Sequence, residues 1–261
     1  MRKTAPPRFE QPGILAFAAW LAVVAFFVVA LSGTRASLGD LVGGVPQIIR
    51  LVGEMLPPST ARLGPVAWAL LETFQMAFVG TVVGVLLSVP LAVLATRHLS
   101  PHPAIYHVAR TSIAFFRTVP DLVWALLFVV SVGLGPFAGV LAIIVDKLGF
   151  CGRFFAEAME EADRGPQEAL AALGARRSAL VACAVLPAAM PSFVATSLFS
   201  LEKATRSSVV LGLVGAGGIG IELKVAMDLF SYDEAATIIL AIFALVLVVE
   251  RASTWLRGRM L

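Results

Sequence analysis

Long apolar runs separated by short polar segments dominate the chain. The clearest run covers residues 14–31, contains no charged residue and follows a short basic N-terminus. A helix needs about 20 mostly apolar residues to cross about 30 Å of hydrocarbon. The apolar part of a secretory signal is shorter, about 7 to 15 residues. The run therefore predicts an uncleaved membrane-spanning helix.

Five later apolar runs extend the prediction to about six spans. The segment between the first two spans contains an amphipathic stretch that suits a helix lying at the membrane surface. The third run carries Arg117, Pro120 and Asp121 in its first half. The predicted spans after the first cover residues 66–95, about 112–133, about 136–152, about 187–206 and about 235–252. The fold class is therefore all-α, as a polytopic membrane protein.

Composition and charge support this class. Hydrophobic residues make up 59% of the 261 residues and charged residues 14%, whereas a soluble domain has about 25% charged residues. The pI near 9.2 does not indicate nucleic-acid binding, because the basic residues are spread over loop ends. Most of them lie on the loops that share a side with the N-terminus, which predicts that both termini are cytoplasmic.

Three regions follow from this organisation. Residues 1–65 would hold a cytoplasmic tail, the first span and an external amphipathic loop. Residues 66–256 would form the membrane core, including a charged cytoplasmic loop at 153–187, and residues 257–261 a short cytoplasmic tail.

Arginines inside the predicted spans are the candidates for a polar pathway. Charges inside a membrane are unfavourable and face a bundle interior or a polar route, and a guanidinium group matches tetrahedral oxyanions. Arg117 precedes Asp121 by four residues, and Arg206 follows Glu202 by four. On a continuous helix each pair would share one face. Two interpretations therefore stay open: each Arg is neutralised by its own helix, or the four residues line an anion pathway.

Other polar residues in the apolar runs receive no function at this stage. Glu72 and Gln75 are expected at a membrane interface. Asp146 and Lys147 are adjacent, and we expect them near the inner edge, where a long side chain can reach the headgroups. The histidines and the two cysteines lack the spacing of a metal site, so no metal is predicted.

The charged loop contains the most specific motif. From Glu168 it reads EALAALGARRSALVACAVLPAAMP, which resembles the EAA loop of ABC-importer permeases. Leu170 and Ala184 are mild departures from the family pattern. The positions that fit it are Glu168, Ala169, Gly174, Leu186 and Pro187.

Local chemistry agrees with this resemblance. Glycine at position 174 favours a left-handed helix cap, and a second helix is expected to begin near Ser178. The resulting hairpin would project from the membrane and couple the chain to an ATPase; the alternative is a simple connecting loop. The resemblance implies the type I ABC importer permease fold.

The chain has no G-x-x-x-x-G-K-[ST] phosphate loop, so nucleotide hydrolysis would belong to another polypeptide. We therefore expect no enzyme activity and no cofactor in this chain, with ATP and Mg bound by the partner ATPase.

A glycine-rich segment near the C-terminus carries a second resemblance. Together with residues 132–142, the run LEKATRSSVVLGLVGAGGIG at 201–220 resembles phosphonate-type ABC permeases. This implies transport of a small phosphorus oxyanion: phosphonate, phosphite, hypophosphite or a phosphate ester. The glycines suit a gate, or equally close helix packing. They are Gly215, Gly217, Gly218 and Gly220.

The resemblance also implies partners and a location. We expect two ABC ATPase subunits, a periplasmic substrate-binding protein and a second permease chain, identical or paralogous, in the bacterial inner membrane. The alternatives are an ABC permease for another small solute, such as an amino acid, and an ion-coupled secondary transporter. The latter predicts internal repeats, which the sequence does not show.

Overall fold

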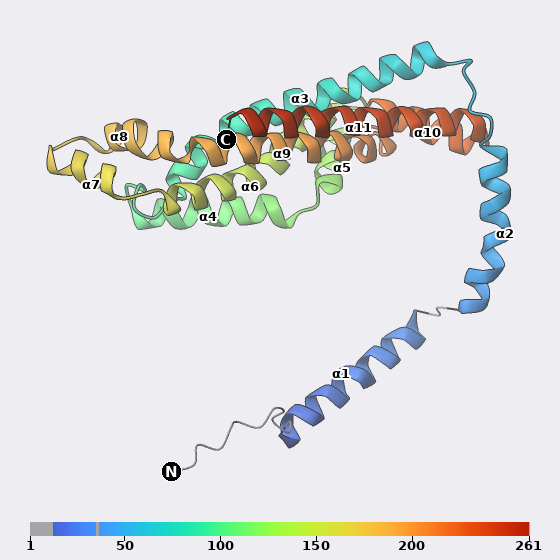
Figure 1. Cartoon of the computed structure of the whole chain (residues 1–261), viewed down its shortest axis with the longest axis horizontal. Coiled ribbons are helices and arrows are strands. Elements are labelled where there is room, and N and C mark those ends of the chain that lie inside the picture. Colours follow the sequence, from blue (N-terminus) through green and yellow to red (C-terminus); the bar gives the residue numbers. More distant parts are fainter. Residues whose placement is uncertain (1–12, 35–36, 261) are drawn as a thin grey trace. The chain divides into compact units, whose positions relative to one another are not determined.

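The computed structural model describes residues 13–34 and 37–260, so the predicted N-terminal tail lies outside the described residues. The chain divides into two compact units, residues 1–54 and 55–261, which are described separately. The first unit contains α1 (Ile14–Gly33) and α2 (Leu38–Glu54) (Figure 1). At 1.5 Å per residue, α1 is about 30 Å long and matches the hydrocarbon thickness.

The second unit is a bundle of helices, and its described residues contain no strand. A π-helical turn at Val181–Val185 joins α8 to α9. The helices of this unit are α3 (Leu63–Leu94), α4 (Pro103–Thr118), α5 (Asp121–Val132), α6 (Pro136–Glu161), α7 (Gly165–Ala172), α8 (Arg177–Leu180), α9 (Leu186–Leu213), α10 (Ile219–Asp228) and α11 (Tyr232–Met260).

Helix α6 is the centre of the bundle and packs against α3, α4, α5 and α9. Its interface with α3 is the most extensive, and two glycines of α3 present no side chain there. A Cβ atom added to Gly80 would lie 2.7 Å from a side-chain carbon of Ile143, and one added to Gly84 would lie 2.5 Å from Cβ of Lys147. Small residues thus allow the two backbones to pack closely, as they do between membrane helices generally.

The third predicted span is not one helix. Helix α4 ends at Thr118 and α5 begins at Asp121, with an angle of 89° between them. Val119 has the extended backbone that a residue before proline favours, so Pro120 ends the first helix. The prediction of a continuous helix over residues 112–133 is therefore wrong.

The predicted number of six spans is not confirmed. Among the described residues, four helical segments are long and apolar enough to cross a membrane, or five if the bent pair α4–α5 forms one span. The four are α1, α3, residues 177–213 and α11. Helix α6 is not among them, although at 26 residues it is about 39 Å long. It carries Asp146, Lys147 and Arg153 within its apolar sequence.

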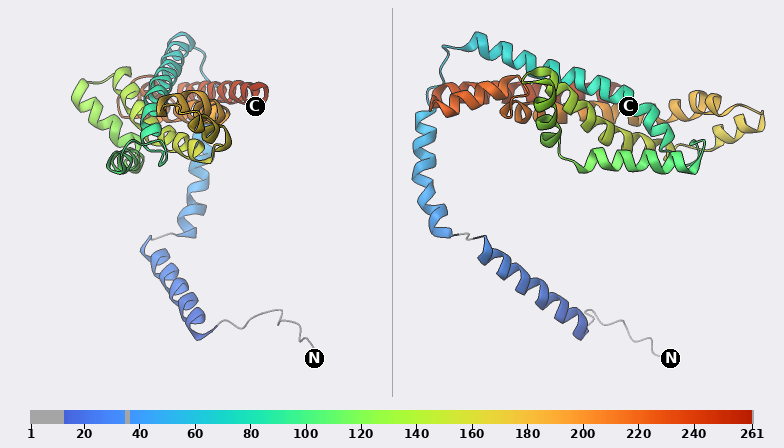
Figure 2. Two further views of the ribbon diagram at one scale, coloured as in Figure 1. Left: turned by 90° about the vertical axis from the view of Figure 1, so that its left-hand side faces the viewer. Right: turned by 180° about the vertical axis from the view of Figure 1, so that it is seen from behind.

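Two features mark opposite ends of the second unit. The hairpin of α7 and α8 projects beyond one end of the bundle, and α10 lies at the other end, as both views show (Figures 1 and 2). Helices α3, α6 and α9 run between these ends. The candidate coupling loop and the candidate gate are therefore separated by the length of the bundle.

Candidate functional site

The projecting hairpin has a well-defined turn at its tip. Gly174 has a φ of +77°, which places it in the left-handed region that glycine adopts most easily. Its N–H donates to the carbonyl of Ala171 at 2.9 Å, and the N–H of Ala175 donates to that of Leu170 at 3.1 Å. These two bonds form a Schellman motif, so the predicted cap at Gly174 is present.

The hairpin offers an exposed surface at the predicted motif. Glu168 and Ala169 are exposed on α7, and within the described part of the chain Glu168 has no ion pair. Leu173, beside the turn, is 83% exposed. Leu186 and Pro187 begin α9 and connect this surface to the bundle.

The turn between α3 and α4 is tied to α6, the helix that leads into the hairpin. Arg110 pairs with Glu160 of α6 at 2.7 Å and donates through Nε to the carbonyl of Ala95, also at 2.7 Å. The backbone N–H of Arg97 donates to Glu160 at 3.1 Å. Partial burial, and then the nearby positive charge of Arg164, lower the pKa of His98 below its usual value. His98 therefore adds no charge to this turn near pH 7.

The first candidate pathway pair is separated by the helix break. Arg117 lies in the last turn of α4 and is exposed, whereas Asp121 begins α5 and accepts a hydrogen bond from the N–H of Leu122 at 3.0 Å. Among the described residues no ion pair joins Arg117 and Asp121. The expectation that both lie on one face of a continuous helix is wrong.

The second pair is also different from the prediction. Glu202 pairs with Arg257 of α11 at 2.8 Å, and its side chain is only 10% exposed. Arg206 is exposed on α9 and has no ion pair among the residues that the structure describes. Glu202 thus neutralises Arg257 on another helix, α11. The guanidinium group of Arg206 stays available to bind an anion.

The glycine-rich segment forms a tight loop before α10. Gly215, Gly217 and Gly218 have φ values of +93°, +90° and +73°, and the N–H of Gly135 donates to the carbonyl of Gly215 at 3.0 Å. Gly220 lies within α10, where an added Cβ would collide with α9. The segment therefore combines irregular backbone with close helix packing. This structure is compatible with both predicted roles of the glycines, a gate and close packing.

Two side chains of α3, which were not among the predicted site residues, form hydrogen bonds to this loop. Glu72 Oε1 accepts a hydrogen bond from the N–H of Gly218 at 3.0 Å, and Thr73 Oγ1 accepts one from the N–H of Ile219 at 2.7 Å. They satisfy free N–H groups at the start of α10, in the manner of helix caps. The sequence contained one indication of this role, because Glu72 is a carboxylate within a long apolar run.

Another pair of charged residues is buried instead of reaching the membrane edge. The Lys147 side chain is 0% exposed and its Nζ lies 2.8 Å from Asp146 Oδ2. Lys203 of α9 lies 2.9 Å from Asp146 Oδ1. The expectation that Lys147 extends to the headgroups is therefore wrong, because its partner is inside the bundle.

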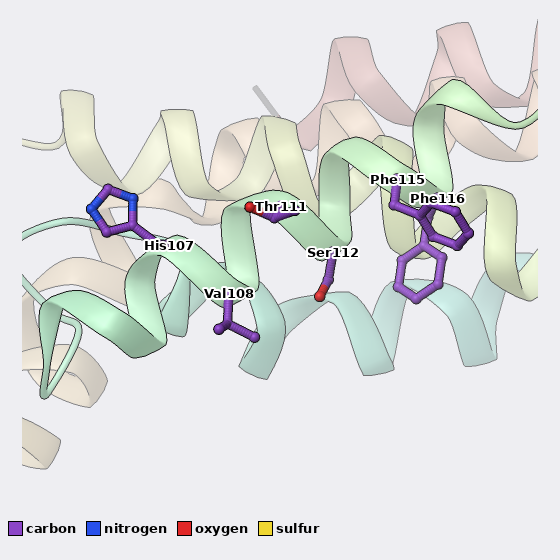
Figure 3. A pocket seen from close by; sticks show the side chains of 6 residues that line it. All are labelled: His107, Val108, Thr111, Ser112, Phe115 and Phe116. Atoms are coloured by element: carbon purple, nitrogen blue, oxygen red, sulfur yellow. The ribbon is translucent and has the colours of Figure 1, made fainter.

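The outward face of α4 carries a separate shallow pocket of about 480 Å³ (Figure 3). His107 lies at one end and two phenylalanines at the other, close to the break before α5. Its lining is His107, Val108, Thr111, Ser112, Phe115 and Phe116. These residues include no carboxylate or guanidinium group, so the pocket lacks the fixed charge that an oxyanion site requires.

Comparison with known proteins connects these features to a family. The chain is 38% identical over 237 residues to the phosphite transport system permease protein PtxC of Stutzerimonas stutzeri, covering 90% of this chain and 86% of that one. It is 40% identical over 208 residues to the phosphate-import permease protein PhnE of Mycolicibacterium smegmatis, covering 79% of this chain. It spans only 39% of the length of that protein.

A solved structure shows the same fold. A chain of the methionine ABC transporter MetNI, in an inward-facing conformation, superimposes with a TM-score of 0.67 and 25% sequence identity. The match covers 77% of this chain and 98% of that chain. The predicted type I importer permease fold is therefore confirmed.

Residues 80–261 match the family described as "binding-protein-dependent transport system inner membrane component". This region includes the projecting hairpin of α7 and α8, the glycine loop and the charged residues of α6 and α9. Together with several apolar helices, the match indicates a multi-pass protein of the bacterial inner membrane. The chain belongs to the family of binding-protein-dependent inner-membrane transport components, the permease subunits of ABC importers.

Proposed function

We propose that this chain is the permease subunit of an importer for a small phosphorus oxyanion, such as phosphonate, phosphite, hypophosphite or a phosphate ester. The observation that carries the proposal is the similarity to permeases named for phosphite and phosphate transport, at 36 to 40% identity over 79 to 92% of the chain. Relatives named for methionine transport are 26% identical.

Energy for transport comes from a separate ATPase in this proposal. Two ATPase subunits, which bind ATP and Mg, dock on the loop at 153–187, and the hairpin turn at Gly174 fixes the shape of the docking surface. The exposed carboxylate of Glu168 and the exposed side chain of Leu173 suit a contact with another protein. The contact residues are Glu168, Ala169, Gly174, Leu186 and Pro187.

The remaining parts of the importer follow from the family. A periplasmic binding protein delivers the substrate, and a second permease chain, identical or paralogous, completes the pathway. Both termini are cytoplasmic in this arrangement, so the hairpin of α7 and α8 is also cytoplasmic. The glycine loop at the opposite end then lies near the periplasm, where Gly215, Gly217, Gly218 and Gly220 act as an outer gate.

The anion pathway uses the exposed guanidinium groups. Arg206 and Arg117 are exposed and have no ion pair among the described residues, so each can offer charge-assisted hydrogen bonds to an oxyanion. Asp121 and Glu202 contribute negative charge to the electrostatic field around these arginines, and Glu202 does so as the partner of Arg257.

Substrate uptake tests this proposal directly. Cells of the native host that lack this chain are compared with cells in which it is restored, using labelled phosphite, methylphosphonate and methionine. We expect restoration of phosphite or methylphosphonate uptake, with methionine uptake unchanged. Restored methionine uptake alone would support the amino-acid alternative, to which the fold of MetNI points.

A further inference from the structure

A cluster of three charged side chains lies between α6 and α9. Asp146 accepts hydrogen bonds from two ammonium groups, from Lys147 Nζ at 2.8 Å and from Lys203 Nζ at 2.9 Å. No further carboxylate joins this cluster among the described residues. The two lysines therefore share the single carboxylate of Asp146.

The cluster lies inside the bundle. Lys147 packs against Gly84, and its carbonyl accepts a hydrogen bond from Ser88 Oγ at 3.0 Å. Both α3 residues belong to its continuous apolar sequence. Lys203 belongs to α9, and both α3 and the segment 177–213 that contains α9 are long and apolar enough to cross a membrane. The cluster thus lies beside two candidate membrane spans.

The cluster is open on one side only. Lys147 is fully buried, whereas the Lys203 side chain is 38% exposed and lies over the ring of Phe150 at 5.2 Å. Phe150 also lines a shallow groove of about 330 Å³ with Phe199 of α9. Arg206 is exposed three residues beyond Lys203, and residues with this spacing share a helix face.

Charged groups in membrane-spanning helices are unfavourable against hydrocarbon and face a bundle interior or a polar route. Building on the proposed function, we infer that Lys203 and Arg206 form a binding station for the phosphorus oxyanion, and that Asp146 is the counter-ion of Lys203 when the station is empty. Lys203 and Arg206 are two basic side chains beside the single carboxylate of Asp146, so an arriving oxyanion supplies a second negative group. Asp146 keeps Lys147 as its partner when Lys203 turns to the anion, so no carboxylate is left unpaired.

The variant Lys203→Gln separates this role from a structural one. It removes the partly exposed ammonium group and keeps the hydrogen bond between Lys147 and Asp146, so the fold should tolerate it. Because a hydrogen bond from a charged donor is stronger than a neutral one, we expect uptake of phosphite or methylphosphonate to fall by about tenfold or more. Recovery of the permease with its ATPase should be unchanged. Lys203→Arg should retain at least about a third of wild-type uptake, because it keeps the charge.

The matched control is Lys224→Gln, which removes an exposed lysine from α10 and should leave uptake unchanged. Uptake by Lys203→Gln within about twofold of wild type, a smaller effect than one charged hydrogen bond gives, would overturn the inference. So would loss of the assembled complex in this variant, because the ammonium would then serve assembly, for example against a second permease chain. A wild-type chain that imports none of these anions would contradict the proposed function itself, and the inference with it.

Discussion

Polar side chains on α3 determine the conformation of a glycine loop that is distant in sequence. Glu72 and Thr73 accept the N–H groups of Gly218 and Ile219, so the start of α10 is fixed to a membrane helix. The loop can therefore be irregular without leaving these two donors unpaired. An outer gate at this position would open by releasing these bonds.

Gly218→Ala tests how strictly this loop is built. The φ of Gly218 is +73°, and an added Cβ would collide with Thr73 Oγ1. We expect a loss of about 1 to 3 kcal/mol of stability, measured as a shift of the denaturation midpoint in detergent. Gly64→Ala is the control, because an added Cβ there has open space. Equal midpoints for the two variants would contradict this description of the loop.

Arg257→Gln tests the pair that joins α9 to α11. Removing the guanidinium leaves Glu202, which is only 10% exposed, without its charged partner. We expect a loss of about 1 to 3 kcal/mol, the cost of leaving a buried group unpaired. Arg153→Gln is a suitable control, because its i,i+4 pair with Glu157 is more exposed and should contribute below about 0.5 kcal/mol. A larger effect at Arg153 than at Arg257 would refute the assignment.

At the scale of the helices, apolar length and turn chemistry predicted most of the bundle. The runs at 14–31 and 66–95 became α1 and α3, and Gly174 became the cap at the tip of the hairpin. The break at Pro120 was missed because the apolar sequences on both sides of it were read as one run, although Arg117, Thr118 and Asp121 interrupt that run. Backbone geometry at one proline decided the structure there, against the hydrophobic pattern.

Partner choice between helices was the part of the candidate site that the sequence could not supply. Spacing of four residues suggested that Glu202 pairs with Arg206, yet Glu202 pairs with Arg257 across a helix interface. The cluster of Asp146, Lys147 and Lys203 likewise joins two helices. Such contacts depend on how helices rotate and pack, which local spacing does not encode.

A double variant tests whether the hairpin of α7 and α8 binds the ATPase. Glu168→Arg combined with Gly174→Pro reverses the exposed charge and removes the turn, because proline cannot adopt a φ of +77° or donate the hydrogen bond to Ala171. We expect ATPase co-purification and substrate uptake both to fall by about tenfold or more, a difference of at least about 1.4 kcal/mol in binding.

The control for this double variant is Asp228→Arg, a charge reversal on the exposed surface of α10 at the opposite end of the unit. It should leave ATPase binding unchanged. Normal ATPase binding by the Glu168→Arg, Gly174→Pro variant would show that the hairpin is not the docking surface.

As a whole molecule, the chain belongs to the permease subunits of ABC importers, and its described residues combine apolar helices with a projecting hairpin. The sequence contains no phosphate loop for ATP. The proposed function therefore assigns ATP hydrolysis to a separate subunit that binds this chain.

The most direct test is purification of the tagged chain from its native host in mild detergent, with mass spectrometry of all proteins that remain bound. We predict recovery of an ATPase that contains a G-x-x-x-x-G-K-[ST] phosphate loop, and a second permease sequence if the partner chain is a paralogue. Recovery of this chain alone, under conditions that preserve known transporter complexes, would contradict the account and favour an ion-coupled secondary transporter.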